Sequence, residues 1–104
     1  MDDVRVYTGT LLADLLLTAA RSMKDRRKPL QALLQRLRNH DYAVAQVGPA
    51  DLTQRAFVAV VAVSGSESRL IERLDGIERM IFASEFEVAD MRREITSSTS
   101  SSRF

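Results

Sequence analysis

Apolar and polar side chains alternate along residues 4–17. The odd-numbered positions from Tyr7 to Leu17 carry no charge, which is typical of a strand that packs one face against a core. The even-numbered positions instead place Asp14 between Leu12 and Leu16. We therefore predict a strand whose odd side faces the core and whose even side is an unusually apolar outer face.

The next segment, residues 22–39, has the period of a helix. Its leucines recur on one face: Leu30, Leu33, Leu34 and Leu37. Pro29 lies within the segment, where an interior proline costs about 3 kcal/mol. Either the regular helix begins near Arg26, or it begins at Ser22 and is distorted at Pro29. Met23 lies seven residues before Leu30 on the same face, which favours the early start.

Two further strands and a second helix are predicted after the first helix. Residues 42–47 form a short strand that Gly48-Pro49 ends. The continuous apolar run 56–63 is typical of a central strand whose two faces are both dry. After the turn at residues 64–66, a helical apolar stripe follows at Leu70, Leu74, Ile77 and Ile81.

The last strand is predicted over residues 86–95. Its apolar positions change from even (Phe86, Val88) to odd (Met91, Ile95), which indicates a β-bulge near Ala89-Asp90. The element order is then βαββαβ. Right-handed crossovers convert this order into an α+β, ferredoxin-like fold: a four-stranded antiparallel sheet with two helices on one face, in the spatial order fourth, first, third, second strand.

Length and composition limit the alternatives. A chain of 104 residues is one domain, which we place at 1–96, followed by a Ser-rich tail at 97–104 expected to be disordered. With no cysteine and one histidine (His40), the chain has no disulfide, thiolate zinc site or cysteine nucleophile. No metal site, cofactor or catalytic group is predicted. The acidic start and the lack of a long apolar run predict a cytoplasmic protein without a membrane segment.

The net charge of +1 hides an uneven distribution. Residues 21–38 contain seven lysines and arginines and one acid, a local charge of +6, whereas residues 41–96 carry a charge of −4. Five of these cations are candidate nucleic-acid contacts: Lys24, Arg26, Arg27, Lys28 and Arg38. Lysine and arginine side chains on such a face contact the phosphates of a nucleic acid. The affinity then depends strongly on salt concentration and little on the base sequence. A solvated helix face is the alternative explanation.

Two other groups of residues are candidate contact sites. Asp51, Gln54 and Arg55 form a polar cluster before the central strand, in which Arg55 either pairs with Asp51 or joins a binding surface. Leu12 and Leu16 mark the outer sheet face as a homodimer interface, unless the tail or the 48–55 connection covers it.

Three segments, 21–27, 33–39 and 51–56, resemble the YlxP-like family of small bacterial proteins, a domain of unknown function. The resemblance implies a ferredoxin-like fold. It also implies a role near the ribosome, because genes of that family often lie near those for a translation initiation factor and a ribosome maturation factor. We therefore expect a non-enzymatic domain that associates with ribosomal RNA or an assembling ribosomal particle. The alternative is a homodimeric scaffold or sensor whose open sheet face binds a protein or a small molecule.

Overall fold

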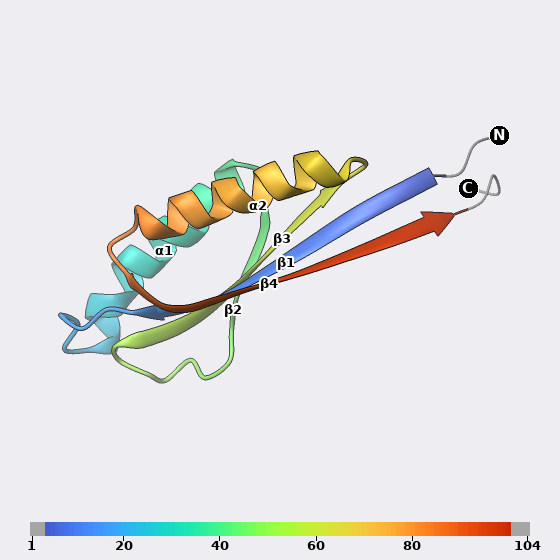
Figure 1. Ribbon diagram of the computed structural model, residues 1–104. Coiled ribbons are helices and arrows are strands. Elements are labelled where there is room, and N and C mark those ends of the chain that lie inside the picture. The colour runs from blue at the N-terminus through green and yellow to red at the C-terminus, as the bar shows by residue number, and fades with distance from the viewer. Residues whose placement is uncertain (1–3, 101–104) are drawn as a thin grey trace.

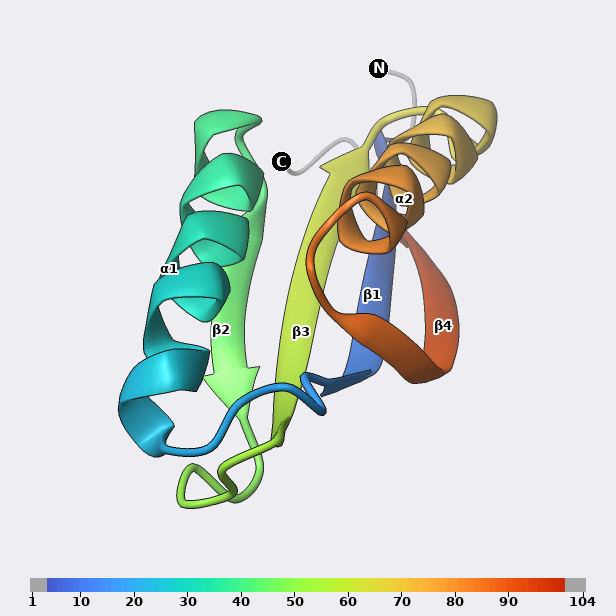
Figure 2. The ribbon, with the colours of Figure 1, turned by 90° about the vertical axis from the view of Figure 1, so that its left-hand side faces the viewer.

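The computed structural model describes residues 4–100 as one sheet covered by two helices (Figure 1). The elements are β1 (Val4–Leu16), α1 (Met23–Asn39), β2 (Ala43–Val47), β3 (Arg55–Ser64), α2 (Glu67–Phe82) and β4 (Glu87–Ser100). The strands are antiparallel in the order β2-β3-β1-β4, and both helices lie on the same face of the sheet (Figure 2). The predicted α+β ferredoxin-like fold and its strand order are confirmed.

The two central strands supply the floor of the core. Leu11, Ala13 and Leu15 of β1 are fully buried, and they alternate with the exposed or half-buried even positions. In β3 every second residue from Ala56 to Ala62 is buried, and Val58 and Val60 among them lie opposite Ala13 and Leu11. The helices cover this floor with their leucine and isoleucine stripes. Among residues 4–100, no helix lies on the opposite face of the sheet.

Helix α1 begins where its capping residue predicts. The Ser22 hydroxyl oxygen accepts a hydrogen bond from the Asp25 backbone N–H at 3.2 Å, and the Asp25 carboxylate accepts one from the Arg21 N–H at 2.9 Å. Pro29 lies inside the helix. The early start is therefore confirmed, because a capped first turn and the buried leucines outweigh the hydrogen bond that the proline removes.

Strand β4 contains the expected bulge and continues further than expected. Asp14 pairs with Asp90 and Leu15 with Val88, so Ala89 is left without an opposite residue. The strand then runs to Ser100, and the prediction of a tail beginning at Ser97 is wrong for residues 97–100. The physical reason is that β1 begins at Val4 and supplies a hydrogen-bonding partner for this stretch, whose small polar side chains need no burial. Residues 101–104 lie outside the described residues.

The sheet narrows to two strands at one end. Strand β3 ends at Ser64, opposite Tyr7. Residues 4–6 therefore pair with β4 alone, and Figure 1 shows these two strands projecting beyond β3.

Candidate functional site

Four of the exposed cations of α1 form the candidate site, and we call this surface the basic flank. It consists of Lys24, Arg27, Lys28 and Arg38. The leucine stripe is buried against the sheet, so the same helix turns these four side chains to solvent. Asp25, the one acid in the segment, is already bound to the backbone N–H of Arg21.

No carboxylate of residues 4–100 forms an ion pair with the basic flank. Within residues 4–100 the ion pairs join Arg55 to Asp14, Arg92 to Asp90, and Arg93 to both Asp75 and Glu78. None of these pairs uses a cation of α1. Because unpaired ammonium and guanidinium groups are gathered along one helix, this surface attracts anions.

Arg26, the fifth predicted contact, has a different role. Its side chain is only 4% exposed. The guanidinium donates hydrogen bonds to the carbonyl oxygens of Arg55 at 3.2 Å and Ala50 at 3.0 Å, and so holds the connection between β2 and β3. We therefore leave Arg26 out of the basic flank. The signal was in the sequence, because Arg26 lies four and seven residues before Leu30 and Leu33, on the buried stripe.

Gln54, which lies in this connection, provides a second set of clamping hydrogen bonds. Its side-chain amide donates to the carbonyl oxygens of Thr18 and Ala20, both at 2.9 Å. The Gln54 carbonyl accepts from the Leu17 N–H at 2.8 Å. Gln54 thereby fixes the loop between β1 and α1, and with it the position of the first turn of α1, which carries Lys24 of the basic flank.

Arg55 pairs with Asp14 rather than with Asp51, so that predicted pairing is wrong. Arg55 Nε and Nη2 donate to the two Asp14 carboxylate oxygens at 2.8 and 2.5 Å. This bidentate hydrogen bonding lowers the pKa of Asp14 and raises that of Arg55. The Arg55 guanidinium also lies over the Phe57 ring, 5.0 Å from its centroid. The antiparallel register explains why Arg55 pairs with Asp14. It places Asp14 directly opposite Phe57, which is two residues from Arg55 and therefore on the same face of β3.

The predicted polar cluster therefore divides into separate parts. Gln54 faces the β1–α1 loop, whereas Arg55 lies on the open sheet face. Among the described residues, no hydrogen bond or ion pair joins Asp51 to either of them. The structure does not bring these three side chains together as one binding site.

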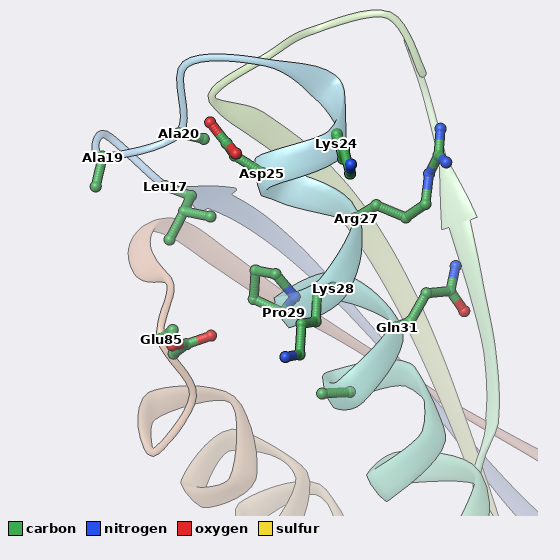
Figure 3. Close-up of a pocket in the computed structure, with 11 residues that line it drawn as sticks. Leu17, Ala19, Ala20, Lys24, Asp25, Arg27, Lys28, Pro29, Gln31 and Glu85 are labelled. Carbon is green, nitrogen blue, oxygen red and sulfur yellow. The ribbon is translucent and has the colours of Figure 1, made fainter.

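A groove adjoins the basic flank at the start of α1. It has a volume of about 1020 Å³ and lies between the β1–α1 loop, α1 and the segment before β4. Leu17, Pro29 and small alanines give it an apolar floor, while Lys24 and Lys28 lie on its α1 rim (Figure 3). Glu85 lines the opposite side. No pattern in the sequence connects Glu85 with α1, since only the fold brings them together.

The remaining predicted residues lie away from this region. Leu12, which is 40% exposed, and half-buried Leu16 lie on the open sheet face. Val61 and Val63 of β3 are also exposed on this face. The exposed His40 caps the end of α1, with its Nδ1 2.9 Å from the Arg36 carbonyl oxygen. Within residues 4–100, no group of three or more histidine, aspartate or glutamate side chains is arranged to hold a metal ion.

Comparison with known proteins assigns the chain to a family. The model of the family described as "Protein of unknown function (DUF503)" matches residues 8–93. The chain belongs to this family. The match covers every residue of the basic flank and of the groove.

Solved structures offer distant likenesses. The de novo designed protein Ferredog-Diesel is 15% identical, with a TM-score of 0.49 over 84% of this chain and 83% of its own. The de novo designed protein Foldit4 is also 15% identical, with a TM-score of 0.38 over 92% and 98%. No curated protein matches the chain. In the part of the chain that the structure describes, neither helix has the length and apolar character needed to cross a membrane.

Proposed function

We propose that the chain is a non-enzymatic RNA-binding domain that associates with ribosomal RNA, or with an assembling ribosomal particle, through the basic flank. The observation that carries the proposal is the set of cations on α1 that no carboxylate of residues 4–100 neutralises. The resemblance to the YlxP-like family supports a location near the ribosome.

The chemistry of a phosphate backbone fits such a surface. Each lysine or arginine that contacts a phosphate releases condensed counterions, so affinity falls steeply as salt rises. A helix of 17 residues is about 25 Å long, which allows cations at both of its ends to reach one RNA molecule. Such contacts orient the protein on RNA without reading its sequence.

Charge reversal tests the proposal. The variant Lys24→Glu/Lys28→Glu/Arg38→Glu should lose cosedimentation with ribosomal particles at low salt, while its circular dichroism spectrum stays unchanged. The matched control is Arg69→Glu/Arg79→Glu/Arg92→Glu, which changes the net charge equally on exposed positions of α2 and β4. Unchanged cosedimentation of the first variant, or equal loss in both, would overturn the proposal.

The open sheet face favours a second function, self-association. Its exposed Leu12, Val61 and Val63 are apolar, and small alanines such as Ala45 and Ala59 leave it flat. The Asp14–Arg55 pair neutralises its own charges, so the β1–β3 part of this face can approach an identical face without burying an unpaired ion. A second copy of this chain therefore fits the face better than a charged partner does.

Solution mass decides this second candidate. Leu12→Ser/Leu16→Ser should halve the mass measured by light scattering, because both changes remove apolar area from the face. Leu12→Val/Leu16→Val, which keeps the face apolar, should stay dimeric. If the parent chain already has the mass of a monomer, the idea is wrong.

A further inference from the structure

Opposite charges face each other across the groove beside α1. Figure 3 shows the Lys28 ammonium and the Glu85 carboxylate extending toward each other from opposite sides. Within the described residues they form no ion pair. Both groups are therefore free to bind one ligand that fills the space between them.

The two sides of the groove offer different hydrogen-bonding chemistry. Lys24 and Lys28 are four residues apart and thus neighbours on the α1 surface, where together they present only donors. On the other side, the Glu85 carboxylate is only an acceptor. The Asp25 carboxylate also lines the groove, on the α1 side, where it accepts a hydrogen bond from the Arg21 backbone N–H.

The apolar floor lies between these two sets. Leu17, Ala20 and the Pro29 ring line it, and the volume of about 1020 Å³ is large enough for a small organic group. A matching ligand carries an anion at one end, a flat apolar body, and hydrogen-bond donors at the other end. A nucleotide whose base bears an exocyclic amino group has this order of groups.

We propose that the groove binds one unstacked, amino-bearing nucleotide of a single-stranded stretch of RNA. Lys24 and Lys28 bind its phosphate, the floor receives the base, and Glu85 accepts from the exocyclic amine. This inference rests on the proposed RNA-binding function and adds a base preference to it. Adenine donates from its amino group where uracil presents a carbonyl oxygen, which the Glu85 carboxylate repels.

Binding of oligoadenylate and oligouridylate of equal length, followed by fluorescence anisotropy at low salt, tests the preference. The parent chain should bind oligoadenylate about tenfold more tightly. Glu85→Ala removes the acceptor, so the ratio of the two affinities should fall to about one, chiefly because oligouridylate binds more tightly once the repulsion is lost. Glu87→Ala, which removes an exposed glutamate outside the groove, should change the binding of both oligonucleotides equally and keep the ratio.

The outcomes separate the groove from the basic flank. Equal binding of both oligonucleotides by the parent chain, or a ratio that Glu85→Ala leaves unchanged, would overturn the groove proposal and leave the basic flank in place. Binding of neither oligonucleotide would overturn both proposals. Lys24→Glu/Lys28→Glu should abolish binding of both, since phosphate contact is common to them.

Discussion

Two adjacent arginines on α1 show how the same side chain takes opposite roles. Arg26 faces the core and donates to the carbonyl oxygens of Ala50 and Arg55. Arg27 is exposed, and Figure 3 shows its guanidinium extending away from the groove. The phase of the helix relative to the core decides the difference. A local charge of +6 therefore overstates the charge that the surface offers to a partner.

Replacing each of these arginines by alanine should give the largest contrast. Arg26→Ala removes two charged hydrogen bonds and leaves a buried gap, and we expect the free energy of unfolding to fall by about 3 kcal/mol. Arg27→Ala should change it by less than about 0.5 kcal/mol, because its side chain is solvated. Urea denaturation measures both, and equal losses in the two variants would contradict the division into an inner and an outer side.

The second clamp should give a smaller loss of stability. Gln54→Ala removes the hydrogen bonds to Thr18 and Ala20, and we expect a loss of about 2 kcal/mol. The β1–α1 loop should also become more accessible to proteases, since of the three hydrogen bonds from residue 54 to this loop the backbone bond with the Leu17 N–H remains and the two side-chain bonds are lost. Thr53→Ala, at the neighbouring position, serves as the control. A Gln54→Ala variant as stable as the parent would show that the loop holds itself.

Substitutions on the exposed side of α1 should change the salt dependence of RNA binding and leave the stability of the fold unchanged. Lys28→Ala should lower the slope of log affinity for RNA against log salt by about 0.7–0.9, the value for one phosphate contact. Gln35→Ala, an uncharged change on the same helix, should leave the slope unchanged. A slope that Lys28→Ala leaves untouched would remove Lys28 from the RNA contact.

The smallest expected effect is a loss of stability at acid pH, which depends on the Asp14–Arg55 pair of the open sheet face. Arg55 holds the pKa of Asp14 below its ordinary value of 3.8, so the ionised carboxylate stabilises the fold above that pH. The stabilisation is lost as the pH falls through the lower, folded-state pKa. The parent chain should therefore be more stable than Asp14→Asn at neutral pH, and urea midpoints should converge in strong acid. Asp51→Asn controls for the loss of one carboxylate. If the difference in urea midpoint between the parent chain and Asp14→Asn stayed constant with pH, the stabilising role of the Asp14–Arg55 pair would be contradicted.

The fold was predictable because its signals are local and periodic. Alternation in β1, the leucine stripe of α1 and the changed parity around Ala89 each follow from spacing along the chain. The extension of β4 to Ser100 was not predictable in this way. Serine and threonine side chains give no apolar pattern there, and the strand forms because β1 lies beside it.

The site was predictable only in part. The exposed lysines follow from the polar face of the helix, and the burial of Arg26 could have been inferred from its phase with Leu30. The partner of Arg55 depends on how β1 and β3 align, which places Asp14 within reach across the sheet. Glu85 lies far from α1 along the chain, so its place in the groove follows from the tertiary structure alone.

The narrowing of the sheet to two strands sets the order in which backbone amides exchange with deuterated solvent. Residues 4–6 are held by β4 alone, and opening this ribbon breaks no contact with the core. Residues 11–15 lie between two partner strands beneath α2, so their protons exchange only when the whole domain opens. Strand β1 thus has a labile end and a protected end on one continuous backbone.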